Sequence, residues 1–245
     1  MQRTLQFAYS IVVYVMFLGV FLYAVGFANN LLVPKSIDSG AAGDLLSAVL
    51  INSLLLGLFA LQHSIMARPW FKREWTKIVP EPIERSTFVL FTNLCLILLF
   101  WKWQPMPQVI WDVQQPIFAG IIWAAFAAGW VIVLISTFLI DHFALFGLRQ
   151  TYYPFINKEA PPIHFMKKGL YKYCRHPIML GFIVAFLATP QMTVGHLFFF
   201  VMTTGYILIA LIFEENDLTM IHGDDYRKYQ KSVPKLCPVS FLKGN

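Results

Sequence analysis

The chain has 245 residues, of which 58% are apolar and 13% are charged. Its apolar residues lie in long blocks separated by short polar joints, which excludes an ordinary soluble core and indicates several membrane crossings. The net charge of +6 follows from basic residues gathered in those joints. We attribute it to membrane orientation and anionic lipid headgroups, and expect membrane lipids but no nucleic acid as partners.

Several apolar segments approach the roughly 20 residues that a helix needs to cross a bilayer. Four lie near 7–30, 45–66, 86–102 and 117–140, and a hairpin follows with legs 178–190 and 195–213. The first leg of the hairpin has only 13 residues, so we expect it to span incompletely, to end at Pro190 or to lie against protein. The sequence therefore predicts an all-α, polytopic membrane bundle of five to six transmembrane helices.

No linker, repeat or low-complexity tract divides the chain, so we expect 1–245 to form a single domain. Residues 1–140 would hold four transmembrane helices, and 141–245 would hold the catalytic region with its hairpin and tail. If the N-terminus is cytoplasmic, every Lys and Arg except Lys35 and Lys102 lies on the cytoplasmic side. We expect a multi-pass protein of a bacterial inner membrane, with both termini cytoplasmic and the chemistry on that face.

The three cysteines show no paired spacing. They are Cys95, Cys174 and Cys237. We therefore expect neither a disulfide framework nor a metal site, and interpret Cys174 as a buried small residue rather than a reactive thiol.

Charged residues bracket the hairpin. Arg175 and His176 precede its first leg, and Glu214 and Glu215 follow its second. Because the chain runs through the membrane and back, we expect the glutamates to return to the face of Arg175 and His176. Neighbouring helical residues point about 100° apart, so only one glutamate should face a pocket.

Pro177 suits the first turn of a helix. The backbone N–H groups of that first turn have no partner within the helix and could hold an anionic or hydroxyl-rich ligand. Each charged residue also has a simpler reading. Arg175 alone could be a membrane-interface anchor, and the glutamates alone could mark a helix that emerges into water. The combination favours a polar ligand site at the bilayer surface.

An ordered pattern carries a resemblance to a known superfamily. The pattern is Gly169-Leu170-Tyr171, Arg175-His176-Pro177, Gly181, Glu214-Glu215-x-x-Leu218, Gly223-x-x-Tyr226-x-x-Tyr229 and Val233-Pro234-x-x-x-Pro238. It resembles the isoprenylcysteine carboxyl methyltransferase and phospholipid methyltransferase superfamily of integral membrane enzymes, which use S-adenosylmethionine. The resemblance implies a cofactor site formed by Tyr171, Arg175, His176, Pro177, Met179, Leu180, Gly181, Glu214 and Glu215, with Tyr226 and Tyr229 in the tail that caps it.

A second resemblance concerns the acceptor. The segments Asp141-His142-Phe143-Ala144-Leu145-Phe146-Gly147-Leu148-Arg149-Gln150 and Thr189-Pro190-Gln191-Met192-Thr193-x-Gly195-His196 resemble a branch that contains methanethiol S-methyltransferases and nitrogen-oxide-associated proteins of denitrifiers. The first of these is the closer likeness. It implies methylation of a small thiol, methanethiol, to dimethyl sulfide.

Two alternatives stay open. One is a methyltransferase with a lipid or prenyl-thiol acceptor, although Met179 stands where the prenylcysteine enzymes commonly carry Tyr. The other is a non-enzymatic accessory or transport protein of nitrogen-oxide metabolism.

A thiol must lose its proton to attack a methyl group, and a simple thiol is mostly protonated at neutral pH. We therefore hypothesise that His142 or Asp141 takes the proton while Arg149 favours the thiolate. A structural hydrogen bond between His142 and Asp141 is the alternative. The sequence leaves the oligomeric state open.

Overall fold

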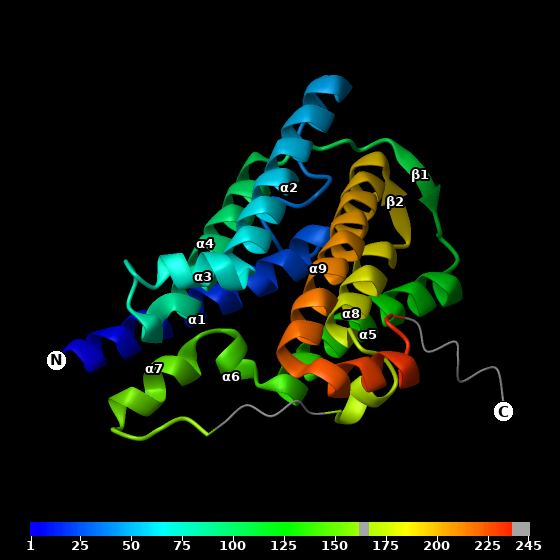
Figure 1. Ribbon diagram of the computed structural model, residues 1–245. Helices are drawn as coiled ribbons and strands as arrows, with labels where there is room; N and C mark the ends of the chain where they lie inside the picture. Colours follow the sequence, from blue (N-terminus) through cyan, green and yellow to red (C-terminus); the bar gives the residue numbers. More distant parts are fainter. Residues whose placement is uncertain (162–166, 237–245) are drawn as a thin grey trace. The chain divides into compact units, whose positions relative to one another are not determined.

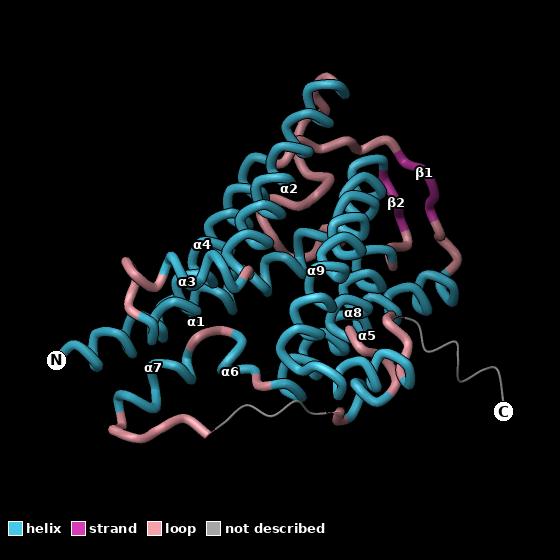
Figure 2. Tube along the Cα trace, viewed as in Figure 1, coloured by secondary structure: helices cyan, strands magenta, loops and turns pink. Residues whose placement is uncertain are grey.

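The computed structural model describes residues 1–161 and 167–236. Cys237 and Pro238 of the sequence motifs lie outside these ranges. In chain order the elements are α1 (Gln2–Ala28), α2 (Leu45–Ala67), α3 (Pro69–Trp75), α4 (Glu81–Lys102), β1 (Val109–Asp112), α5 (Pro116–Ile140), α6 (His142–Leu145), α7 (Leu148–Phe155), the 3-10 helix η1 (Gly169–Lys172), α8 (Pro177–Leu187), β2 (Gln191–Thr193) and α9 (Val194–Ser232). Figure 2 shows that helices make up most of the described chain, joined by loops and accompanied by short strands.

Five helices in the described part of the chain are long and apolar enough to cross a membrane: α1, α2, α4, α5 and α9. Large apolar side chains on their surfaces face outward, such as Leu54, which is 73% exposed, and Ile117, which is 68% exposed. Outward apolar groups are expected where the solvent is lipid hydrocarbon. The predicted polytopic helical bundle is confirmed.

Polar residues fix where several helices begin. The Asp44 side chain accepts a hydrogen bond from the Ser47 N–H at the start of α2, and the Gln115 side chain does the same for the Phe118 N–H at the start of α5. These caps satisfy N–H groups that have no partner within the first turn of a helix. Pro177 opens α8 as predicted, because its missing N–H is no loss there.

The chain divides into two compact units, and each unit contains residues from before and from after residue 140. The described residues of unit 1 are 1–108, 142–161 and 193–196, and those of unit 2 are 109–141, 167–192 and 197–236. The single-domain interpretation stays a prediction.

Unit 1 is built on α1, α2, α4 and α7. α4 packs against both α1 and α2, and α7 packs against α1 (Figure 1). Its core is an apolar cluster around Val13, Met66, Phe88 and Val89. A buried hydrogen bond of 2.7 Å from Ser86 Oγ to Ser10 Oγ joins α4 to α1 and satisfies two hydroxyls that would otherwise be costly in an apolar environment.

Unit 2 is organised by the contact between α5 and α8. The two helices approach so closely that a Cβ added at Gly181 would lie 2.7 Å from the Gly129 carbonyl oxygen. A Cβ at Gly129 would in turn lie 2.7 Å from the Ala185 nitrogen. Small residues permit such close packing between membrane helices. Gly181 therefore allows α8 to pack closely against α5.

The first leg of the hairpin is short, as expected, and α8 has only 11 residues. It ends at Leu187 instead of Pro190, and a turn follows in which the Thr189 N–H donates to the Leu187 carbonyl, before strand β2. Residues 109–113 pair with this segment: β1 pairs with β2, and the Val113 N–H donates to the Pro190 carbonyl.

The second leg of the hairpin continues past the expected end at residue 213. α9 runs for 39 residues to Ser232, with a kink at Gly223, where φ is 55°. Glycine adopts this backbone conformation without the steric cost that a side chain would bring. The glutamates therefore stand within a helix instead of at its end.

Candidate functional site

The centre of the candidate site is the buried carboxylate of Glu215 on α9, whose side chain is 9% exposed. Its Oε1 lies 2.7 Å from Arg175 Nε and 2.6 Å from Arg175 Nη2, in the turn before α8. His176 Nε2 lies 3.2 Å from the same oxygen. Lys235 Nζ lies 3.0 Å from the other oxygen, Oε2. The predicted return of the glutamates to Arg175 and His176 is confirmed.

The Arg175 guanidinium also binds the end of α9. Its Nη1 donates to the carbonyl oxygen of Gln230 at 2.9 Å and to that of Val233 at 2.6 Å. These bonds and the contacts with Glu215 engage four of the five guanidinium N–H groups. The Arg175 side chain is 8% exposed. Arg175 therefore holds Glu215 and the C-terminal end of α9 in one fixed arrangement.

The two glutamates face different surroundings, as the helical geometry predicts. Glu215 is enclosed, whereas the Glu214 side chain is 43% exposed, with its Oε2 3.5 Å from His176 Nδ1. Both ring nitrogens of His176 thus face carboxylates.

A backbone strap holds the segment that follows α9. The Arg175 N–H donates to the Pro234 carbonyl at 3.0 Å, and the His176 N–H donates to the Lys235 carbonyl at 3.2 Å. The buried thiol of Cys174 lies 3.1 Å from the Leu236 carbonyl oxygen. Cys174 is therefore a buried residue with a structural contact, as expected.

Three tyrosines of the predicted cofactor site are packed together. The Tyr229 hydroxyl donates to the Tyr171 carbonyl oxygen at 2.5 Å, and the Tyr226 and Tyr229 rings meet edge to face. Tyr226 and Tyr229 form a small buried core with Val233. Burial, reinforced by the nearby Glu214 carboxylate, raises the pKa of Tyr171, so this side chain stays a neutral hydrogen-bonding phenol.

The predicted site residues of α8 lie in its first two turns. Pro177 and Gly181 are buried, and Met179 and Leu180 are half-buried. Gly181 faces α5, so its structural role is helix packing. The ligand-binding roles of these residues stay predictions.

The C-terminal end of α5 lies beside η1. A Cβ added at Gly169 of η1 would lie 2.8 Å from Leu139 Cδ1, and the Tyr171 hydroxyl lies 3.4 Å from the Ser136 carbonyl oxygen. Asp141 ends this helix and is half-buried. The fourth long helix therefore ends beside Tyr171.

The boundary between the units falls directly after Asp141, and His142 belongs to unit 1. His142 is 4% exposed, and its Nε2 lies 2.8 Å from the Tyr14 hydroxyl of α1. The rings of Tyr14, Phe143 and Phe146 surround it. Sequence reasoning missed Tyr14, because one tyrosine in a long apolar run is a weak signal.

Arg149, the third predicted acceptor residue, also belongs to unit 1. Its guanidinium donates to the Pro161 carbonyl, and it lies 5.8 Å from the centre of the Tyr153 ring. Its proposed effect on a thiolate stays a prediction. No cluster of three or more His, Cys, Asp or Glu suited to a metal ion occurs within residues 1–161 and 167–236.

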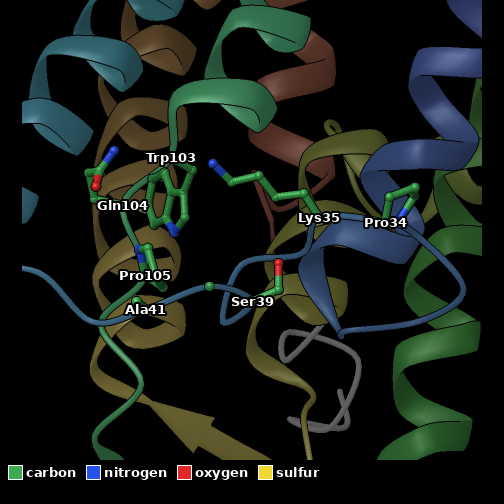
Figure 3. Close-up of a pocket in the computed structure, with 8 residues that line it drawn as sticks. Pro34, Lys35, Ser39, Ala41, Trp103, Gln104 and Pro105 are labelled. Atoms are coloured by element: carbon green, nitrogen blue, oxygen red, sulfur yellow. The ribbon is translucent and has the colours of Figure 1, made fainter.

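Unit 1 also has an open surface hollow of about 400 Å³, which Figure 3 shows in close-up. Lys35, Trp103, Gln104 and Pro105 are among the residues that line it. The Lys35 ammonium donates to the Trp101 carbonyl at 2.6 Å. None of the residues predicted for the cofactor or acceptor site lines this hollow.

The chain is similar to several curated proteins over nearly its whole length. It is 52% identical over 238 residues to a methanethiol S-methyltransferase of Mycobacterium tuberculosis, covering 97% of this chain and 98% of that protein. It is 51% identical over 236 residues to methanethiol S-methyltransferase 1 of Bradyrhizobium diazoefficiens, covering 96% of this chain and 83% of that protein. The chain belongs to the methanethiol S-methyltransferase family.

Membership in this family makes the chain a methyltransferase and confirms the sequence-based resemblance. A more distant likeness reaches the Nurim homolog of Drosophila melanogaster, which is 29% identical over 217 residues, covering 84% of this chain and 80% of that protein. No protein-family model matches the chain, and neither does any solved structure.

Proposed function

We propose that this chain transfers a methyl group from S-adenosylmethionine to methanethiol, which gives dimethyl sulfide. The observation that carries the proposal is the identity of about half of all residues, over nearly the full length, to proteins named methanethiol S-methyltransferase. Likeness over the whole length favours the same acceptor more strongly than a shared cofactor motif would.

The residues around Glu215 fit S-adenosylmethionine. When bound, this donor supplies a methyl group activated by a sulfonium, and it also carries an ammonium, a carboxylate and ribose hydroxyls. Glu214, with a side chain 43% exposed, offers negative charge to its cations, and Lys235, with a side chain 41% exposed, offers positive charge to its carboxylate. Tyr171 can add hydrogen bonds to hydroxyl groups. This combination of opposite charges supports the donor assignment.

On the acceptor side we propose that His142 accepts the proton that the thiol loses. A thiol of the cysteine type has a pKa of about 8.5, so most of it is protonated at neutral pH. The His142 ring is buried among aromatic rings, and its Nε2 meets the Tyr14 hydroxyl, which fixes the orientation of the ring. Asp141 is the alternative proton acceptor, and Arg149 would favour the thiolate through its charge.

We further propose that both termini lie in the cytoplasm of a bacterial cell and that the protein resides in the inner membrane. In the described part of the chain five helices are long enough to cross, and a sixth crossing completed by α8 and the segment that leads into α9 would place both termini on the same side. The Lys and Arg residues favour the cytoplasmic side for the termini and for the Glu215 cluster.

The test supplies purified protein with methyl-tritiated S-adenosylmethionine and, in parallel, with methanethiol, a prenylated thiol or membrane lipid as acceptor. The proposal expects label in a volatile thioether only with methanethiol, and none from Glu215→Gln protein. Label in lipid or in the prenylated thiol would replace the acceptor, and no transfer to any acceptor would refute the proposal.

A further inference from the structure

We infer that Lys235 binds the carboxylate of the methyl donor. The inference rests on the proposed function, because it takes S-adenosylmethionine as the ligand. It concerns a residue that lies between the motif positions Pro234 and Pro238. The observations that carry it are the separate contacts of Glu215 with Arg175 and Lys235 and the different exposure of the two cations.

Arg175 is poorly suited to receive a ligand. Its side chain is 8% exposed, and four of its five N–H groups already meet Glu215 and the carbonyls of Gln230 and Val233. A ligand carboxylate bound in the usual two-pronged manner would need two of those N–H groups. Arg175 therefore acts as the residue that positions Glu215 and the end of α9.

Lys235 has the opposite properties. Its side chain is 41% exposed, and its contact with Glu215 Oε2 requires one of the three N–H groups of an ammonium. Its backbone is nevertheless fixed, because its carbonyl oxygen accepts a hydrogen bond from the His176 N–H. A cation on a fixed backbone and open to solvent can meet an incoming anion without rearrangement of the site.

The local charge also favours an anion at this position. Arg175 and Lys235 are two cations around the single carboxylate of Glu215, and the exposed part of this set is the Lys235 ammonium. The exposed Glu214 carboxylate lies on the other side of His176, at its Nδ1. The arrangement offers a positive and a negative group to one ligand that carries both charges.

The test compares two ligands by calorimetry on the full chain in detergent. One is S-adenosylmethionine and the other is its decarboxylated analogue, which keeps the sulfonium and the ammonium. A charge-assisted hydrogen bond contributes about 10–100-fold in affinity. We expect wild-type protein and the conservative variant Lys235→Arg to prefer S-adenosylmethionine by about this factor.

Lys235→Gln should weaken S-adenosylmethionine by about 10–100-fold and leave the decarboxylated analogue unchanged, which abolishes the preference. The matched control is Lys231→Gln, an exposed lysine in the last turn of α9, which should keep the preference. A Lys235→Gln protein that still prefers the carboxylate overturns the inference and leaves the proposed function standing. Wild-type protein that binds neither ligand overturns both.

Discussion

Replacing each glutamate by glutamine tests the central geometry, because the two neighbours differ sharply in burial. Glu215→Gln leaves the buried Arg175 cation without its counter-charge. Removing one partner of a buried ion pair costs about 3–5 kcal/mol. For a chain of this size each kcal/mol lowers the melting temperature by about 2–4 °C, so we expect a decrease of about 6–20 °C. Glu214 is 43% exposed, and its loss should cost no more than about 1 kcal/mol.

The assay is thermal unfolding of the detergent-solubilised chain, followed by calorimetric titration with S-adenosylmethionine at a temperature where both variants are folded. Glu215→Gln should lose most of the donor affinity, whereas Glu214→Gln should keep its melting temperature and lose only part of that affinity. Equal melting temperatures for the two variants would refute the reasoning, since exposed and enclosed carboxylates would then matter equally.

Three further outcomes follow from the contacts. Gly181→Ala should destabilise the chain by about 1–3 kcal/mol, measured by thermal unfolding, because the added Cβ meets the Gly129 carbonyl oxygen. Gly120→Ala, also a glycine of a membrane helix, is the control and should be neutral, since nothing lies within 4 Å of its Cβ. His142→Ala should reduce turnover while calorimetric donor affinity stays unchanged; loss of affinity would move His142 to the donor site. Tyr14→Phe should reduce turnover without altering donor affinity, because the Tyr14 hydroxyl orients the His142 ring, and unchanged turnover would leave Tyr14 a structural role.

The membrane fold and the return of the glutamates could be predicted because they depend on length and direction. Counting apolar residues places the crossings, and a chain that crosses and returns must bring Glu214 and Glu215 back to Arg175. The choice between the glutamates needs the rotation of α9 about its own axis. Composition does not contain that information, since Glu214 and Glu215 are chemically identical.

The end of α9 was predicted wrongly for a related reason. The continuous apolar run stops at residue 213, and the predicted second leg of the hairpin ends there. A helix is held by its backbone hydrogen bonds, however, and continues through polar residues beyond the bilayer. The structure carries it to Ser232.

The pairing of β1 with β2 and the position of Lys235 beside Glu215 escaped prediction because both rest on long-range contacts. A strand of three or four residues has too little pattern to be recognised. Lys235 occupies an unspecified position of the Val233-Pro234 motif, and the hydrogen bonds from the Arg175 and His176 N–H groups to the Pro234 and Lys235 carbonyls hold it beside Glu215. The motif gave no reason to select this lysine.

The most direct test of the account is mass spectrometry of the headspace above purified protein supplied with methanethiol and S-adenosylmethionine that carries a trideuterated methyl group. The account predicts dimethyl sulfide with one deuterated and one ordinary methyl group, formed in equal amount to the S-adenosylhomocysteine released. Donor consumption without a volatile thioether, or a thioether without the deuterium label, would contradict it.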